Sequence, residues 1–192
     1  LRLTPYGILA IMTSTIATSD FGAIWTLGKF VLASYAALIV MYIIHLIIVT
    51  GLGLNPVTFV KKTGEVLLFA FTSRSSAGSL PLNVQTQKNR LGVPDGIANF
   101  SASFGLSIGQ NGCAGIYPAM LAVMVAPAAG VEVNLQFILA VIGVVIISSF
   151  GVAGVGGGAT FASIIVLSTL NLPVALAGVL ISVEPLIDMG RT

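Results

Sequence analysis

The chain has 192 residues, of which 56% are hydrophobic and only 7% charged, and its mean hydropathy is +1.06. Soluble globular domains carry roughly 25% charged residues, so this composition excludes a soluble domain and predicts an integral membrane protein. The net charge of +2 comes without a basic patch, so we expect no nucleic-acid partner, and a single cysteine excludes an intrachain disulfide. The chain begins with Leu1 and ends at Thr192 within a helical pattern. We therefore expect a fragment of a longer protein, without a signal peptide.

Two transmembrane helices are predicted in residues 1–55. Residues 5–25 are apolar with Thr and Ser interruptions. Residues 30–54 form a clean apolar stretch that exceeds the roughly 20 residues a bilayer core requires. Apart from two tyrosines, His45 is the only ionisable residue in this stretch. We expect it to be a buried, hydrogen-bonded or interface histidine and not part of a proton relay.

A helical hairpin is predicted after Asn55-Pro56. Apolar residues 57–71 lead into the polar segment TSRSSAGS, and residues 80–92 lead back. Neither arm is long enough to cross a bilayer comfortably, so we expect the hairpin to enter the membrane, turn at residues 73–79 and leave on the same side. Short basic loops stay cytoplasmic, so the hairpin enters from the inside, where its base carries four basic residues: Lys61, Lys62, Lys88 and Arg90.

A second hairpin is predicted further on, with arms at residues 135–147 and 160–170. Its tip is the segment GVAGVGGG, residues 151–158, and its base carries Glu132 without any Lys or Arg, as expected for the outer face. Non-helical backbone at membrane depth is tolerated only where it is buried in protein or lines a cavity. We interpret the tip as exposed backbone at a binding site. The alternative is that its glycines only let helices pack closely.

The two hairpins belong to an inverted repeat. One crossing separates them, residues 95–130, interrupted by the segment GLSIGQNGCAG, and a last span begins at Pro173. The second hairpin must therefore point the opposite way from the first. We predict a first repeat over residues 56–130 and a second over residues 131–192. Matching interrupted segments of this kind indicate the site of a secondary transporter.

Three ionisable residues share one face of the last predicted helix. In VEPLIDMGRT, Glu184, Asp188 and Arg191 are spaced i, i+4 and i+7. Pro185 also leaves the carbonyl near Ile181 without its usual donor. Ionisable residues inside a membrane are costly and indicate function. The alternative is a self-compensating salt-bridge network that only fixes helix packing.

The tip of the first hairpin combines a cation with hydroxyl groups. A buried guanidinium requires an anionic partner, so we expect Arg74 to pair with Glu184 or Asp188. Ser75 and Ser76 stand where the second arm begins, and helix N-termini attract anions. We therefore expect the α-carboxylate of a substrate at this tip. The alternative is a serine cap without a ligand.

Three motifs carry a family resemblance: FTSRSSAGSLP, GVAGVGGGA and LIDMGRT. In this order they closely resemble the dicarboxylate/amino acid:cation symporters, which include the glutamate and aspartate transporters. The segments SIGQNGCAGIYPAMLAVMVAP and SVEPLIDMGRT are most similar to the bacterial L-cystine uptake branch. The resemblance covers essentially the whole chain. It implies an all-α integral membrane transport domain with two opposed re-entrant helical hairpins and discontinuous transmembrane helices, beginning at the family's fifth transmembrane helix and stopping inside the eighth. It also implies a homotrimer and a multi-pass protein of the inner (plasma) membrane.

The resemblance assigns roles to the last helix. Asp188 matches the acid that holds the substrate ammonium, and Arg191 matches the cation that meets a substrate carboxylate away from the α-carbon. Glu184 stands where sodium-coupled members have an ion-binding Asp. The expected substrate site comprises Ser75, Ser76, Gly154, Val155, Gly156, Asp188, Arg191 and Thr192.

The segment GQNGC departs from the sodium-coupled pattern Asn-Met-Asp-Gly-Thr. Asn111 replaces a sodium-ligating carboxylate and Gly109 lacks a side-chain oxygen, so we expect at most a weak Na⁺ site, at Gly109, Asn111 and Ser149. A carboxylate in a low-dielectric site is a candidate proton carrier, and Glu184 fits that description. We expect ion coupling to involve Gln110, Asn111, Glu184 and Arg74. The coupling cation stays open between H⁺ and Na⁺, no cofactor is expected, and Cys113 is interpreted as a packing residue.

The leading hypothesis is a secondary amino-acid symporter, not an enzyme, with L-cystine as substrate and the lipid bilayer as its surroundings. The alternative is a sodium-coupled symporter of aspartate and glutamate. An intramembrane protease is disfavoured because the motifs GxSG and GxGD are absent from the sequence. An ion channel requires a symmetric pore, whereas opposed hairpins and buried charges of both signs suit a closed site.

Overall fold

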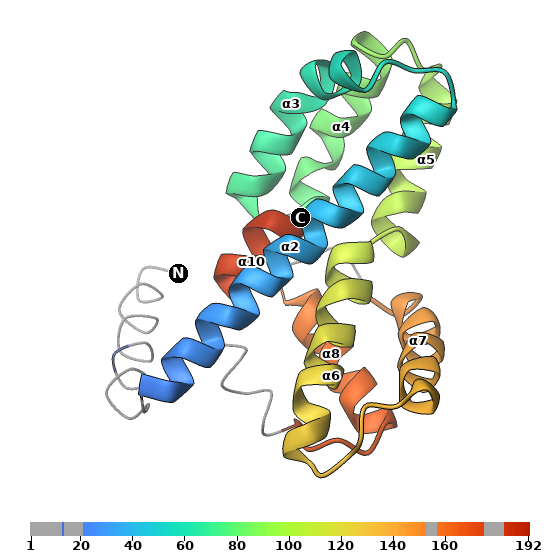
Figure 1. Cartoon of the computed structure of the whole chain (residues 1–192). Helices are drawn as coiled ribbons and strands as arrows, with labels where there is room; N and C mark the ends of the chain where they lie inside the picture. Colours follow the sequence, from blue (N-terminus) through green and yellow to red (C-terminus); the bar gives the residue numbers. More distant parts are fainter. Residues whose placement is uncertain (1–12, 14–20, 153–156, 175–182) are drawn as a thin grey trace.

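The computed structural model describes Thr13 and residues 21–152, 157–174 and 183–192. Every regular element in these residues is a helix, as the family resemblance implies (Figure 1). In chain order they are α2 (Phe21–Gly51), α3 (Pro56–Ser73), α4 (Ser76–Asn89), α5 (Asp95–Ile108), the π-helix η1 (Asn111–Ile116), α6 (Tyr117–Ala128), α7 (Leu135–Ser149), α8 (Gly158–Thr169) and α10 (Glu184–Arg191).

The helices form two groups that meet at α10. Figure 1 shows α3, α4 and α5 in one half of the molecule and α6, α7 and α8 in the other, with α2 running obliquely past α10. The turn between α3 and α4 faces the middle of the molecule, and so do the ends of α7 and α8 that flank residues 153–156. The short, charged helix α10 therefore lies where both hairpins and the break after α5 come together.

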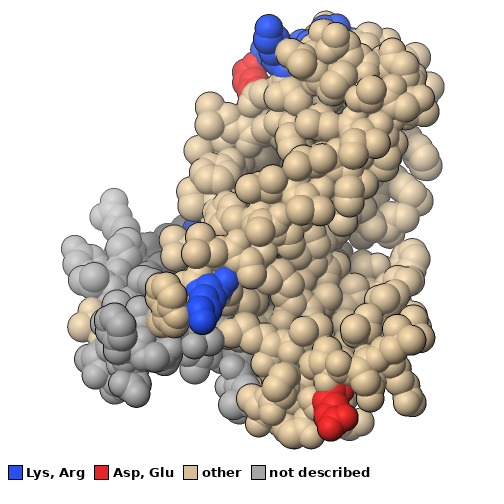
Figure 2. Space-filling view, in the orientation of Figure 1, with Lys and Arg blue, Asp and Glu red and all other residues tan. Residues whose placement is uncertain are grey.

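Two helical stretches in the described residues are long and apolar enough to cross a membrane, Leu27–Gly51 and Asp95–Ala128. The first lies within α2, which begins at Phe21 and not near residue 30 as predicted. Its large apolar side chains are mostly exposed. Figure 2 shows charged side chains near the ends of the visible face and beside the undescribed residues, with uncharged surface between them. This distribution suits a helical bundle whose sides face lipid or another apolar partner.

The first hairpin turns more tightly than predicted. Asn55 caps α3 by accepting hydrogen bonds from the N–H groups of Val57 and Thr58, ahead of Pro56 at the first turn. Helix α3 then continues to Ser73 and α4 starts at Ser76. Only Arg74, in the left-handed conformation with φ 51°, and Ser75 are non-helical. The predicted tip over residues 73–79 is therefore too long. The small and polar residues that follow Ser75 can form the first turn of α4, because the side chain of Ser75 caps this helix.

The long crossing is broken over fewer residues than predicted. Helix α5 ends at Ile108, Gly109 and Gln110 are non-helical, and the chain resumes as η1. The predicted interruption over residues 105–115 was thus too wide. Pro118 has no N–H to donate to the carbonyl four residues before it, in η1, and a π-helical turn accommodates such a defect. The predicted interruption of this helical segment is present.

The second group packs through small residues. Ala122 and Ala126 of α6 are fully buried, as are Val166 and Leu167 of α8. Helix α7 begins after Asn134, whose side chain accepts a hydrogen bond from the N–H of Phe137. Helices α7 and α8 cover the two predicted arms to within a few residues. The glycine-rich tip falls partly on residues 153–156, which lie outside the described residues.

Candidate functional site

A buried ionic cluster is built on one face of α10. Arg191 Nη2 lies 2.6 Å from Glu184 Oε1 and 3.0 Å from Asp188 Oδ1, and Arg191 Nε donates to the same Asp188 oxygen at 3.0 Å. The Arg191 side chain is only 1% exposed. The predicted helical spacing is therefore realised as direct contact. Removing one member of such a buried network typically costs about 3–5 kcal/mol, because a charge is left uncompensated.

Tyr117 forms the floor of this cluster. The Arg191 guanidinium carbon lies 4.4 Å from the centre of the Tyr117 ring, a cation–π contact. Arg191 Nη1 and the Tyr117 hydroxyl are both buried, and neither has a hydrogen-bond partner within the part of the chain that the structure describes. Buried polar atoms are normally paired. These two groups are therefore candidates to meet a ligand.

Glycine permits α10 to lie against η1. A Cβ atom placed on Gly112 would lie 2.8 Å from both the Cβ atom and the carbonyl oxygen of Arg191. On the other side of α10, a Cβ atom on Gly190 would lie 2.7 Å from the ring of Tyr35, whose hydroxyl donates to the Leu186 carbonyl at 2.7 Å. Close packing of glycines, the alternative considered for the glycine-rich tip, thus operates at these two positions.

The second hairpin also reaches the cluster. The Thr160 hydroxyl, from the first turn of α8, donates to Glu184 Oε2. Glu184 thereby links α10 to α8 while it pairs with Arg191. Sequence reasoning did not select Thr160, because a Thr in an apolar arm has no distinctive signature.

The expected ion pair of Arg74 is not formed. Arg74 is exposed at the turn of the first hairpin, and both carboxylates that were expected to pair with it pair with Arg191 instead. The premise that Arg74 is buried was wrong. The physical reason is that Arg191 lies on the same helix as Glu184 and Asp188. The three side chains therefore meet without a second helix having to be positioned against α10.

The serines at the first tip have different surroundings. Ser75 Oγ accepts a hydrogen bond from the Gly78 N–H at 3.0 Å, which is the cap that was considered as the alternative to a ligand site. Ser76 lines a cavity that also contains Arg191 and Thr192. Of the two serines, Ser76 is therefore the one that faces the same space as the end of α10.

The break after α5 carries the predicted ion-coupling residues. Gln110 donates to the Leu106 carbonyl, and the Asn111 N–H donates to the Gly109 carbonyl at 3.1 Å. Asn111 Nδ2 also lies 3.2 Å from His45 Nε2 of α2. His45 is hydrogen-bonded, as predicted, but it is exposed and not buried.

Among the described residues, the Ser149 side chain makes no hydrogen bond to the break after α5. Its hydroxyl donates to the Ile146 carbonyl at 2.7 Å within α7. No group of three or more His, Cys, Asp or Glu side chains gathers as metal ligands would in the described ranges.

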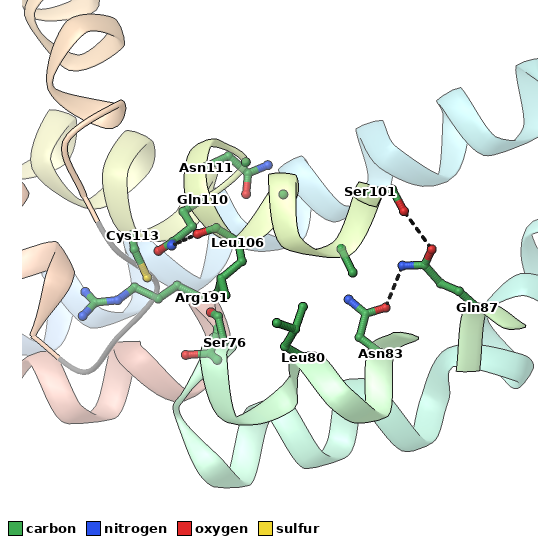
Figure 3. Close-up of a pocket in the computed structure, with 14 residues that line it drawn as sticks. Ser76, Leu80, Asn83, Gln87, Ser101, Leu106, Gln110, Asn111, Cys113 and Arg191 are labelled. Atoms are coloured by element: carbon green, nitrogen blue, oxygen red, sulfur yellow. Dashed lines mark hydrogen bonds between the residues drawn. The ribbon is translucent and has the colours of Figure 1, made fainter. Parts of the chain in front are cut away.

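A cavity of about 310 Å³ joins the hairpin tip, the break and the end of α10. Figure 3 shows Arg191, Cys113 and Gln110 at one end and Asn83, Gln87 and Ser101 at the other. Cys113 thus lies at a cavity wall, not solely in packing. The cavity is lined by Ser76, Leu80, Asn83, Gln87, Ser101, Ala102, Gly105, Leu106, Gly109, Gln110, Asn111, Cys113, Arg191 and Thr192.

The structure gathers most of the predicted site residues. Six of them line the cavity: Ser76, Gly109, Gln110, Asn111, Arg191 and Thr192. Glu184 and Asp188 join it through Arg191. Gly154, Val155 and Gly156 lie outside the described residues. The cavity can therefore present hydroxyl and amide groups to a small polar molecule, while the Arg191 guanidinium points away from it into the ionic cluster (Figure 3).

The whole chain matches a known protein family. A sequence profile of the sodium:dicarboxylate symporter family covers residues 1–192. The chain is 74% identical to the L-cystine uptake protein TcyP of Bacillus licheniformis, 73% to that of Shouchella clausii and 68% to that of Bacillus cereus. Each similarity covers 100% of this chain but only 41–42% of the relative. The chain thus spans less than half the length of the curated relatives it matches.

Proposed function

Because the chain belongs to the sodium:dicarboxylate symporter family, we propose that the protein is a secondary active symporter that takes up L-cystine together with a cation. The observation that carries this proposal is the ionic cluster of α10, buried beside a polar cavity. Side chains of α8 and α6 contact the cluster, and η1 and α2 pack against α10. Relatives at 67–74% identity are named for L-cystine uptake, which supports cystine over aspartate and glutamate as substrate. Membership of a symporter family also agrees with the expectation that the protein is not an enzyme.

The substrate roles follow the charges of the cluster. Two carboxylates face one guanidinium, so carboxylate groups outnumber cations in the cluster, which suits a cationic ligand group. We assign the substrate ammonium to Asp188 and a substrate carboxylate to Arg191, whose buried Nη1 atom has no hydrogen-bond partner among the described residues. Ser75, Ser76 and Thr192 would bind the α-carboxylate, together with the backbone of Gly154, Val155 and Gly156.

Coupling is assigned to Glu184 and the break. Glu184 is buried and hydrogen-bonded by Thr160, so its protonation would change the charge of the cluster. Gln110 and Asn111 present amide oxygens near this cluster, whereas Gly109, Asn111 and Ser149 lack a carboxylate for Na⁺. These features favour H⁺ as the coupling ion. Arg74 would act from the hairpin tip, without a direct pair to Glu184.

The architecture is proposed on the same basis. The opposed turns of α3–α4 and α7–α8 (Figure 1) support re-entrant hairpins that enter from opposite sides. Residues 56–130 and 131–192 would then be inverted repeats, preceded by two transmembrane helices in residues 1–55. We propose a multi-pass protein of the inner (plasma) membrane that assembles as a homotrimer.

Uptake of labelled L-cystine tests the proposal. The full-length protein is reconstituted in proteoliposomes and compared with the Arg191→Met variant, which leaves the cluster without its cation. We expect concentrative, saturable uptake for the wild type and none for the variant. Absence of cystine uptake in the wild type, or preferential uptake of aspartate, would contradict the proposal.

A further inference from the structure

The cavity extends well beyond the residues assigned to one amino-acid head group. From Ser76, Arg191 and Thr192 it continues between α4 and α5 to Gln87 and Ser101. Ser76, Leu80, Asn83 and Gln87 follow one face of α4 at helical spacing. At 1.5 Å per residue, Asn83 lies about 10 Å along the helix from Ser76. The cavity therefore has a second end at a distance from the ionic cluster.

Neutral hydrogen-bonding side chains form this second end. Gln87 Nε2 donates to Asn83 Oδ1 at 3.1 Å, and the Ser101 hydroxyl donates to Gln87 Oε1 at 2.9 Å (Figure 3). These two bonds fix the orientation of both amides. We call Asn83, Gln87 and Ser101 the amide subsite.

The amide subsite keeps hydrogen-bonding capacity toward the cavity. Each amide nitrogen carries two N–H groups. Among the hydrogen bonds of the described residues, Gln87 uses one of its side-chain N–H groups and Asn83 uses neither. Figure 3 shows the Asn83 nitrogen directed toward the cavity and away from Ser101. Donors here suit a carboxylate, and the carbonyl and hydroxyl oxygens suit an ammonium. A zwitterionic head group needs both.

Cystine has the matching dimensions. Its disulfide places the two α-carbons about 5.5 Å apart, and each carries a carboxylate and an ammonium beyond it. A molecule with its first head at Ser76 and Arg191 would therefore bring its second head toward Asn83. In this placement Arg191 meets the carboxylate of the first head, and not the carboxylate away from that α-carbon that the family resemblance implies.

We propose that the amide subsite binds the second amino-acid head group of cystine and so determines selection of this long substrate over single amino acids. This inference rests on the proposed function. When a single amino acid binds, the amide subsite stays hydrated. When cystine binds, its second carboxylate and ammonium replace this water and form hydrogen bonds with the subsite. The absence of charge at the subsite also fits a head group whose own two charges compensate each other.

Direct binding to the purified full-length protein tests the subsite. Affinities for L-cystine and for S-methyl-L-cysteine, which has a single head group, are measured by calorimetry in nanodiscs for the wild type, Asn83→Ala and Gln87→Ala. Loss of one to two hydrogen bonds predicts roughly tenfold weaker cystine binding in each variant. Binding of S-methyl-L-cysteine should change less than twofold. Gln85→Ala, an exposed glutamine of the same helix, is the matched control.

The outcomes separate the subsite from the transport function. Wild-type protein that binds neither ligand overturns the proposed function. Wild-type protein that binds cystine, with Asn83→Ala and Gln87→Ala as tight as Gln85→Ala, overturns the subsite alone. Parallel weakening of both ligands also overturns it, because the effect is then on the common head-group site. If Gln87→Ala fails to fold, Gln87→Met preserves the side-chain length and removes the amide.

Discussion

Arg191 connects the charged residues of the site with its aromatic floor. Its guanidinium contacts two carboxylates and the ring of Tyr117 while its side chain is almost completely buried. The pairing satisfies most of its donors in the absence of a ligand. Under the proposed function, a substrate carboxylate would accept hydrogen bonds from Nη1, and the substrate ammonium would share the Asp188 carboxylate with Arg191. The internal network is thus compatible with binding, although it also stabilises α10 by itself.

The first prediction concerns Asp188. Asp188→Asn keeps the shape of the side chain but removes the charge expected to hold the substrate ammonium, so cystine uptake should be abolished, since losing one partner of a buried charge pair costs about 2–5 kcal/mol. Glu184 still pairs with Arg191 in this variant, so the protein should reach the membrane in normal amounts. The measurement is labelled-cystine uptake alongside surface expression, with Glu132→Gln as control. Near-normal apparent affinity in Asp188→Asn would refute the assigned role.

The second prediction concerns His45 and the orientation of Asn111. An amide nitrogen only donates, so its contact with Nε2 makes that ring nitrogen the acceptor and leaves Asn111 Oδ1 for the cavity. His45→Leu removes the acceptor. The cation concentration for half-maximal uptake should rise severalfold, because one hydrogen bond of about 1 kcal/mol no longer orients the amide.

His45→Gln provides the conservative comparison for this contact. Its side-chain oxygen can accept from Asn111, so its cation dependence should stay within twofold of the wild type. Equal behaviour of the Leu and Gln variants would show that the hydrogen bond does not position Asn111.

At the scale of elements, the π-helix η1 and α10 form one unit. Pro118 disturbs the helical hydrogen bonding of η1, and the absence of a side chain at Gly112 lets the backbone of Arg191 approach. The break after α5 and the ionic cluster are thereby held at a fixed distance. A displacement of either helix should therefore displace the other.

The third prediction tests this close approach. Gly112→Ala places a methyl group about 2.8 Å from Arg191 atoms, so η1 and α10 must separate. Overpacking of this kind typically costs about 1–3 kcal/mol, and we expect a lower midpoint of thermal unfolding and weaker cystine binding. Gly115→Ala in the same π-helix meets nothing within 4 Å and should change neither property. Matching results for the two variants would contradict the packing role of Gly112.

At the scale of the whole molecule, α10 lies between two helical groups that it contacts through different residues. Glu184 meets Thr160 of the second group, and the end of α10 shares a cavity with Ser76 of the first. A change of charge at Glu184 would therefore alter a contact between the groups. Under the proposed function, this contact would link ion binding to a rearrangement of the hairpins.

The fourth prediction concerns the driving ion. Cystine uptake into proteoliposomes is measured with a proton gradient or a sodium gradient imposed alone. We expect the proton gradient to have the larger effect, and Glu184→Gln to abolish the response to it because a neutral amide cannot exchange the proton. Excess unlabelled cystine should compete strongly in the same assay, and aspartate and glutamate weakly. Strict dependence on sodium would assign coupling to the amide-rich break instead.

The helical class, the two hairpins' arms and the spacing of Glu184, Asp188 and Arg191 were determined by the sequence itself, because hydropathy and helical periodicity are local properties. Motif chemistry likewise located the family and six of the residues that line the cavity. Tertiary structure alone decided which charges pair: Arg74 is exposed, and Arg191 takes both carboxylates. It also brought His45 to Asn111, Thr160 to Glu184 and the amide subsite into the cavity. These contacts join residues from separate helices whose mutual rotation no local pattern specifies, since a neutral Asn, Gln or Thr shows its role only through the side chains that packing places opposite it.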